Sequence, residues 1–180
     1  MPSIDKLKIK LFADGADFNS MLALYNDPKI KGFTTNPTLM KKMGITNYEH
    51  FAKQVLAAIP DRPVSFEVFA DDLDGMLNQA KLIASWGPNV NVKIPVTNTK
   101  GDFTGPIIRK LAAAGVKLNI TAIMTLEQVK EVANNLSIET AAIVSVFAGR
   151  IADTGLDPMP IMRQCVDVLN NLPKTELLWA

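Results

Sequence analysis

The sequence has few of the residues from which metal sites and disulfides are built. Its 180 residues include one histidine and one cysteine, Cys165. A lone cysteine cannot form an internal disulfide, and no group of histidine and cysteine residues has the spacing of a metal site. We therefore expect no bound metal. Because a chain without disulfides is typical of a reducing compartment, we also expect a cytoplasmic location.

Excess charge and long apolar runs are also lacking. Nineteen basic residues nearly balance eighteen acidic ones, giving a net charge of +1, whereas binding to nucleic acid or to anionic membranes needs clustered positive charge. No run approaches the roughly 20 apolar residues of a membrane span, and the N-terminus lacks the apolar core of a signal peptide. We expect no nucleic-acid partner and no membrane, so any phosphate ligand is small and locally held.

What the sequence does have is a large apolar fraction and a regular alternation of segments. Hydrophobic residues make up 48% of the chain and charged residues 21%, which is typical of a globular protein, and no linker divides it. We expect one domain, residues 1–180. Strand-like segments, each followed by a helical segment, occupy residues 6–15, 30–37, 63–70, 89–96, 116–124 and 140–150, and a seventh begins at residue 175.

This alternation predicts a parallel sheet covered by helices, which is either an open sheet or a closed barrel. The polar residues within the strands bear on the choice. Side chains two positions apart share a face, and each of the six complete strands has polar residues on one face near its carboxyl end. These residues are Asp14, Thr34, Asn36, Ser65, Glu67, Asn91, Lys93, Asn119, Thr121 and Ser145.

The shared face of these residues favours the barrel. An open sheet with helices on both faces would bury them separately, at a cost of roughly 2–7 kcal/mol for each unpaired group. A barrel instead gathers them inside its carboxyl-terminal end, where enzymes with this architecture have their active sites. We therefore predict a (β/α)8 TIM barrel with a central polar cluster.

The cluster contains one lysine, Lys93, within the otherwise apolar strand segment VNVKIPV. Burial disfavours a charged ammonium group, and a neutral amine is a nucleophile toward carbonyl compounds. This predicts Schiff-base chemistry, in which an iminium promotes cleavage or formation of a carbon-carbon bond. Asp14 is the candidate for moving the hydroxyl proton, Glu67 and Thr121 are candidates for orienting a water, and the neighbouring amides suit the hydroxyls of a sugar-like substrate.

The same residues also have structural interpretations. Asp14 could cap the next helix, and Thr34 and Asn36 could be turn residues before the following proline. Lys93 and Glu67 could form a buried ion pair, which stabilises little. The amides and hydroxyls of the later strands could satisfy hydrogen bonds inside a barrel. An ion pair alone, however, explains neither the amides nor the hydroxyls around it.

Five motifs of the chain resemble those of a known family. LFADGAD, GFTTNPT, FEVFA, VKIPVT and VSVFAGRIADTG occur in the order and at the spacings of the transaldolases, most closely of their short branch, which includes the fructose-6-phosphate aldolases. The resemblance covers essentially the whole chain, and the combination of TTNP with VKIP is specific. It implies a barrel of the class I aldolase type, a lysine Schiff base without metal or organic cofactor, and sugar phosphates as substrates.

The resemblance also implies a role for individual residues. Lys93 corresponds to the Schiff-base lysine, Asp14 to the proton-transfer carboxylate, and Glu67 with Thr121 to the pair that holds the catalytic water. A second set corresponds to substrate-binding positions, at which hydroxyl groups of a dihydroxyacetone unit and, through the arginine, a phosphate are bound. That set is Thr34, Asn36, Asn119, Ser145, Phe147 and Arg150.

Two positions bear on which activity the resemblance implies. In the family, aldolases tend to carry glutamine at the position of Glu67 and tyrosine at that of Phe147, whereas transaldolases carry glutamate and phenylalanine. We therefore expect transfer of a dihydroxyacetone unit from fructose 6-phosphate or sedoheptulose 7-phosphate to an aldose phosphate, as in the pentose phosphate pathway. The alternatives are a direct fructose-6-phosphate aldolase and a noncatalytic barrel remnant.

The resemblance departs from the family at the end of the sequence. Family members continue past LLWA with further residues of the phosphate site, an eighth strand and a last helix, whereas this sequence ends at Ala180. The last β/α unit is therefore expected to be absent from these 180 residues, which would leave strands 1 and 7 unpaired. Members of the short branch are often ring-like, so we also expect a homo-oligomer.

Overall fold

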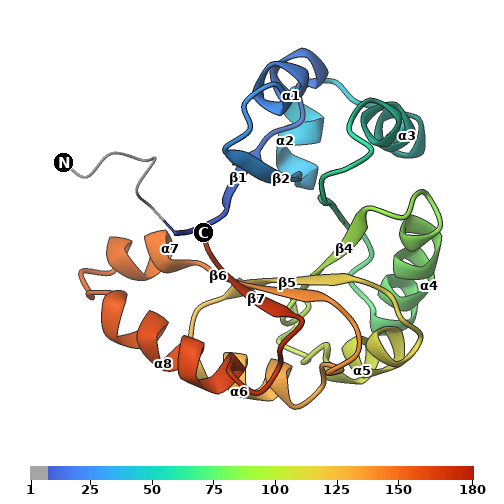
Figure 1. Ribbon diagram of the computed structural model, residues 1–180. Helices are drawn as coiled ribbons and strands as arrows, with labels where there is room; N and C mark the ends of the chain where they lie inside the picture. The colour runs from blue at the N-terminus through green and yellow to red at the C-terminus, as the bar shows by residue number, and fades with distance from the viewer. Residues whose placement is uncertain (1–7) are drawn as a thin grey trace.

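Seven parallel strands form one curved sheet in the computed structural model, which describes residues 8–180 (Figure 1). The strands lie side by side in the order in which they occur in the chain, and each pair of neighbours is parallel. The sheet is a TIM-barrel-like arrangement of alternating strands and helices. The strands are β1 (Leu11–Asp14), β2 (Ile30–Thr34), β3 (Val64–Glu67), β4 (Val90–Pro95), β5 (Leu118–Ile123), β6 (Ala142–Val146) and β7 (Thr175–Trp179).

Helices cover the outer, convex face of this sheet (Figure 1). They are α1 (Phe18–Tyr25), α2 (Pro37–Lys42), α3 (Tyr48–Ala58), α4 (Leu73–Ala84), α5 (Gly105–Ala113), α6 (Leu126–Ala133), α7 (Ala148–Asp153) and α8 (Met159–Leu169). The last of them, α8, packs against β7 and α6 and carries Cys165, which is fully buried. Burial raises the pKa of the Cys165 thiol. No helix within residues 8–180 is long and apolar enough to cross a membrane.

The alternation of strands and helices expected from the sequence is confirmed, with two additions. The short helices α2 and α7 follow β2 and β6 closely, where the sequence pattern predicted none. Each has six residues, too few to show a helical period. The expected first strand begins at residue 6 and the expected domain at residue 1, and residues 1–7 lie outside the described residues.

Burial differs between the centre of the sheet and its edges. Nearly every residue of β4, β5 and β6 is buried, whereas none of β1 or β7 is. The side chains that point outward from the central strands form the core with the helices, and Phe66, Ile94 and Ile120 among them are fully buried. Because successive side chains of a strand alternate between faces, this outer core fixes which residues point inward.

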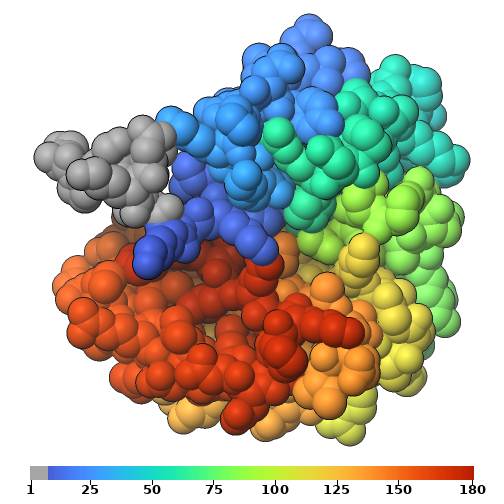
Figure 2. All heavy atoms as spheres, in the orientation of Figure 1, coloured from blue at the N-terminus to red at the C-terminus, as the bar shows by residue number. Residues whose placement is uncertain are grey.

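The two edge strands of the described sheet, β1 and β7, approach each other at one side of the molecule. There the Lys10 ammonium and the Glu176 carboxylate form an ion pair. Several large apolar side chains near this edge are exposed, including Ile9 at 63%, Val166 at 49% and Trp179 at 51%. Figure 2 shows this side of the surface, with the blue start of the described chain beside the red C-terminal segment. The edge is therefore held together at one point and open around it.

Candidate active site

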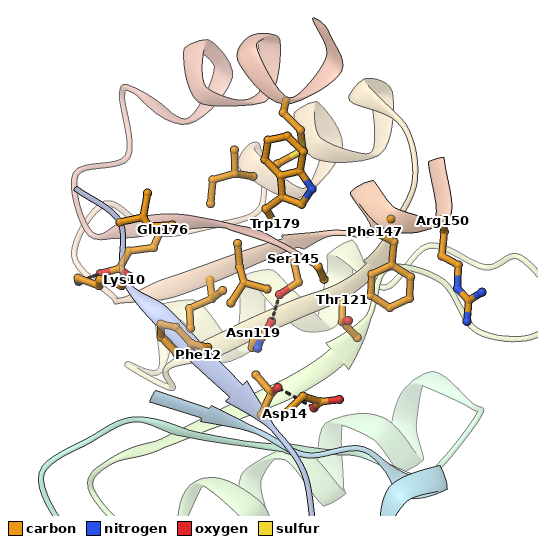
Figure 3. Close-up of a pocket in the computed structure, with 18 of the residues that line it drawn as sticks. Lys10, Phe12, Asp14, Asn119, Thr121, Ser145, Phe147, Arg150, Glu176 and Trp179 are labelled. Carbon is orange, nitrogen blue, oxygen red and sulfur yellow. Dashed lines mark hydrogen bonds and ion pairs between the residues drawn. The ribbon is translucent and has the colours of Figure 1, made fainter. Parts of the chain in front are cut away.

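A cavity of about 1350 Å³ lies along the inner face of the sheet and reaches past β1 and β7 to α8. Of the ten residues that the sequence assigns to the site, all except Glu67 line it. Figure 3 shows six of them, and they come from β1, β5, β6 and the start of α7. The structure thus brings into one cavity residues from both ends of the chain. Those lining residues are Asp14, Thr34, Asn36, Lys93, Asn119, Thr121, Ser145, Phe147 and Arg150.

Lys93 occupies a central place in this group. It lies on β4, where the strand register places it between Glu67 of β3 and Asn119 of β5. Its side chain is 11% exposed, and its Nζ lies 3.3 Å from Glu67 Oε2. The same nitrogen donates a hydrogen bond to the backbone oxygen of Thr35 at 3.2 Å. These two contacts take two of the three donors of an ammonium group and anchor the amine at the wall of the cavity.

Glu67, which pairs with Lys93, lies in an environment that perturbs its ionisation. Burial raises the pKa of Glu67, and the neighbouring Lys93 ammonium opposes that rise. The hydroxyl of Tyr48 on α3 donates to the backbone oxygen of Glu67 at 2.9 Å, which fixes the end of β3. Burial also raises the pKa of Tyr48, so its hydroxyl stays a neutral donor. A carboxyl group with a raised pKa exchanges protons closer to neutral pH than an ordinary one.

Three polar side chains form a buried chain of hydrogen bonds beside Lys93. Ser145 Oγ on β6 donates to Asn119 Oδ1 on β5 at 2.8 Å, and Asn119 Nδ2 donates to Ser65 Oγ on β3 at 3.0 Å. Because β4 lies between β3 and β5, the second bond crosses the inside of the curved sheet. The chain fixes which end of the Asn119 amide faces each strand, since exchanging its oxygen and nitrogen would break both bonds.

Asp14 is held by two residues of the neighbouring strand segment. Thr34 Oγ1 donates to Asp14 Oδ1 at 2.7 Å, and Asn36 Nδ2 lies 3.5 Å from Asp14 Oδ2. Asp17, not Asp14, caps α1 by accepting from the backbone nitrogen of Ser20. The capping alternative for Asp14 is therefore wrong, and its carboxylate is free to face the cavity.

Asn36 caps a helix and also contacts Asp14. Its Oδ1 accepts a hydrogen bond from the backbone nitrogen of Leu39 at 2.9 Å and so caps α2, which begins with Pro37. This bond orients the amide so that its nitrogen points toward Asp14. The structural role as a helix cap therefore sets the geometry of the site.

Three further residues complete the cavity wall. Thr121 is 3% exposed, and its Oγ1 is buried without a hydrogen-bond partner among residues 8–180. Phe147 and Arg150 lie where β6 gives way to α7 (Figure 3). The Arg150 side chain is 73% exposed, and its nitrogen lies 3.3 Å from a carboxylate oxygen of Asp153. An ion pair this exposed binds weakly, so an anionic group entering the cavity can compete for the guanidinium.

The sequence of this chain is similar to those of several known proteins. The profile of one family, transaldolase/fructose-6-phosphate aldolase, matches residues 11–180. A probable transaldolase of Dehalococcoides mccartyi is 37% identical over 160 residues, which are 89% of this chain and 70% of that protein. Probable transaldolase 2 of Listeria monocytogenes is 34% identical over 173 residues, covering 96% of this chain and 75% of that protein. The chain belongs to the transaldolase/fructose-6-phosphate aldolase family.

Membership of this aldolase-type enzyme family confirms the resemblance drawn from the sequence motifs. A crystal structure of dihydrodipicolinate synthase from Rhodopseudomonas palustris superimposes with a TM-score of 0.61 and 16% identity, covering 93% of this chain and 62% of that chain. At this identity the likeness concerns the fold alone. Among the described residues, no group of three or more histidine, cysteine, aspartate or glutamate side chains is placed to hold a metal ion.

The structure of this family member adds contacts that the site residues assigned from the sequence did not include. Ser65 shares the inward face of β3 with Glu67, so strand parity already contained the signal for its bond to Asn119. Thr35 acts through its backbone oxygen and Tyr48 through a hydroxyl from another element. Sequence spacing carries no signal for either of these two contacts.

Proposed function

We propose that this chain transfers a dihydroxyacetone unit between sugar phosphates through a Schiff base on Lys93. The observation that carries the proposal is the enclosed amine of Lys93, which lies 3.3 Å from Glu67 on the wall of a cavity lined by amides and hydroxyls. A neutral amine in such a place attacks the carbonyl carbon of a ketose. The Glu67 carboxylate is placed to accept the proton that the ammonium must lose.

Imine formation and hydrolysis use the polar groups next to the lysine. After Lys93 Nζ adds to the C2 carbonyl, the carbinolamine must lose its hydroxyl as water, which requires a proton. Glu67 supplies that proton, because burial raises its pKa. The Thr121 hydroxyl, buried on the cavity wall without a partner among residues 8–180, holds the departing water and later the attacking one. A hydroxyl with no protein partner is free for this task.

Asp14 is the base in carbon-carbon cleavage. Its carboxylate removes the proton of the C4 hydroxyl, the bond between C3 and C4 breaks, and the iminium takes up the electron pair as an enamine while the aldose phosphate leaves. In the second half the enamine attacks the acceptor aldehyde, and Asp14 returns the proton to the new hydroxyl. The hydrogen bond from Thr34 at 2.7 Å keeps the carboxylate oriented through both halves.

The remaining residues bind the substrate. Asn119 and Ser145, fixed by their mutual bond, present polar groups to the hydroxyls of the dihydroxyacetone unit, as do Thr34 and Asn36 near Asp14. The exposed guanidinium of Arg150 binds the phosphate.

Transfer is favoured over release of free dihydroxyacetone by Phe147, which offers no acidic proton with which to quench the enamine. Glu67, like Phe147, is the residue that the resemblance to transaldolases, rather than to aldolases, implies. The enamine therefore persists until an acceptor aldehyde arrives.

We further propose that the sheet belongs to a (β/α)8 barrel whose eighth strand would lie between β7 and β1. Two observations support this: β1 and β7 are the edges of the described sheet, and the apolar side chains of Val166 and Trp179 beside them are exposed. In the 180-residue protein, backbone amides on the free side of β7 should exchange with solvent much faster than those of β5. Equal protection in both strands would contradict the proposal.

Intact mass after reduction with borohydride tests the Schiff base. The protein incubated with fructose 6-phosphate should gain the mass of a reduced three-carbon unit, since cleavage leaves that unit on the lysine. Lys93→Met should abolish the adduct and lower turnover by about 10⁴-fold or more. Lys10→Met is the matched control, because Lys10 lines the same cavity but is exposed and paired with Glu176.

The outcomes separate the candidate activities. An adduct that persists in Lys93→Met would contradict the assignment of the lysine. An adduct in the wild type, with release of aldose phosphate beyond one equivalent only when an acceptor aldehyde is present, identifies a transferase, and steady release of free dihydroxyacetone without an acceptor identifies an aldolase. A folded wild-type protein that forms no adduct would support a noncatalytic barrel.

A further inference from the structure

The end of β5 departs from regular strand geometry at one residue. Ala122 has a backbone φ of 61° and is, among residues 8–180, the one residue other than glycine with a positive φ. In this left-handed region the Cβ atom of an L-amino acid crowds its own backbone, so the conformation is unfavourable for alanine and rarer still for β-branched residues. An unfavourable conformation next to a cavity-lining residue, Thr121, calls for a structural explanation.

The strand pairing shows what Ala122 does to β5. Ile120 pairs with Val144 and Ile123 pairs with Val146, so two residues of β5, Thr121 and Ala122, lie opposite a single residue of β6. This is a β-bulge, in which one extra residue is inserted into one strand of a pair.

The extra residue changes which side chains face the cavity. In a regular strand Ile123 would share the face of Asn119 and Thr121, because side chains two apart point the same way. The bulge instead places Ile123 in the outer core with Ile120, where both are fully buried and neither lines the cavity. The apolar side chain is thereby kept out of the site, and Thr121 becomes the last cavity-facing residue of the strand.

Thr121 itself is held firmly on its other side. Its backbone oxygen accepts a hydrogen bond from the backbone nitrogen of Val96 at 2.9 Å, and it pairs with Pro95 of β4. Its Oγ1 remains buried without a partner among the described residues. The backbone is thus fixed on one side by β4 and on the other by the bulge, while the hydroxyl is left free.

We propose that the left-handed conformation of Ala122 is a positioning device that keeps Thr121, with its unpartnered hydroxyl, on the cavity wall and keeps Ile123 out of the cavity. The inference deepens the proposed function and rests on it, because the hydroxyl so placed holds the water of the imine steps. Ala122 touches no substrate and acts through Thr121. Alanine occupies the left-handed region at a cost, but at a lower one than a β-branched residue, whereas glycine, asparagine and aspartate tolerate it better.

Substitutions that differ in their tolerance of a positive φ test the inference. Ala122→Gly and Ala122→Asn retain access to the left-handed region and should keep kcat within a few-fold of the wild type. Ala122→Val does not, and its kcat should fall by about 10²-fold with little change in KM, since the water rather than the bound sugar is displaced. If the valine variant does not fold, Ala122→Thr, which is also branched at Cβ but polar, takes its place in the same comparison.

A double-mutant cycle separates positioning from a general structural effect. Thr121→Val removes the hydroxyl through which Ala122 acts, so adding Ala122→Val to it should lower kcat no further. An equal additional loss in that background would overturn the inference, and so would a valine variant with wild-type kcat. Borohydride trapping on the same wild-type sample keeps the two proposals apart: no adduct there overturns the proposed function and this inference with it, whereas an adduct with additive mutants overturns this inference alone.

Thermal melting gives a second, independent measurement. Glycine relieves the steric crowding at a positive φ, so Ala122→Gly should leave the melting temperature unchanged or raise it. Ala142→Gly in the neighbouring strand β6 is the matched control and should lower it, because Ala142 is buried at an ordinary strand position. Equal losses for the two glycine variants would show that Ala122 is not strained and would overturn the inference.

Discussion

The centre and the edge of the sheet contribute different kinds of residue to one cavity. The central strands β4 to β6 supply Lys93, Asn119 and Ser145, which are buried. Asn119 and Ser145 are hydrogen-bonded to each other, and Lys93 pairs with Glu67. The edge supplies Asp14 and α7 supplies Arg150, and both are exposed. In the proposed reaction the covalent step thus occurs where the protein is most rigid, and the groups that meet changing aldehydes and phosphates are those with the most freedom.

We expect the largest effect on activity at Asp14, because this residue lies at the edge of the sheet and yet takes part in the proposed reaction. Asp14→Asn keeps the acceptor oxygen for Thr34 but removes the proton-transfer group, so kcat should fall by about 10²–10⁴-fold. The melting temperature should stay unchanged, since the side chain is exposed. Asp167→Asn on the outer surface of α8 controls for loss of one negative charge. A loss of activity below tenfold would count against Asp14 as the proton-transfer group.

The free energy of unfolding should depend strongly on whether a substituted residue is buried in the sheet or exposed at its edge. Phe33→Ala, in a fully buried position of β2, should lower the free energy of unfolding by about 3–5 kcal/mol through lost burial and a residual cavity. Trp179→Ala at the edge removes a larger side chain, but one that is 51% exposed, so the loss should stay below about 1 kcal/mol. Urea denaturation measures both. Similar losses would mean that the edge is covered in solution.

The pH dependence of stability tests the environment of Glu67. Burial and the Lys93 cation shift the pKa of this carboxyl group in opposite directions. Because burial dominates and raises its pKa, Glu67 favours the folded state below its ordinary pKa, and that contribution is lost as pH rises through the raised value. The unfolding free energy of the wild type, measured against Glu67→Gln across this range, should therefore fall with increasing pH. A rise instead would show that the Lys93 cation outweighs burial and lowers the pKa.

The smallest effect is expected at the contact that joins the two edges. The Lys10 and Glu176 side chains are 60% and 47% exposed, and exposed ion pairs contribute about 0.2–1 kcal/mol. Lys10→Gln should lower the free energy of unfolding by that amount, and the difference should vanish near 1 M salt, where screening is strong. A salt-independent loss would indicate a packing role for the lysine stem.

The sequence predicted the alternation of strands and helices because each strand and most helices carry their own periodic signal. It predicted residues that line the cavity because polar residues such as Lys93 and Asn119 recur on one strand face. Contacts that cross the sheet or use the backbone leave no such signal. The Asn119–Ser65 bond depends on the curvature of the sheet, and the Lys93 contact to Thr35 uses a main-chain oxygen. The bulge at Ala122 was missed because alanine is not a residue expected at a positive φ.

The same lack of a short-range pattern explains why the sequence did not predict α2 and α7. Six residues in α2 and in α7 give no periodic pattern, although Asn36 followed by Pro37 is a recognised helix start. The α7 helix has no capping side chain at all. Both helices begin directly beside site residues, so their boundaries matter more to the cavity than to the fold.

The buried thiol of Cys165 gives this molecule an intrinsic reporter. It is the sole cysteine of the chain and lies fully buried on α8, the helix beside the open edge. A thiol reagent can reach it only after α8 separates from the sheet, so the rate of labelling measures how often that helix opens in the native protein. Opening at this edge of the sheet can thus be followed without any added label, and a ligand that stabilises the edge will lower the rate of labelling.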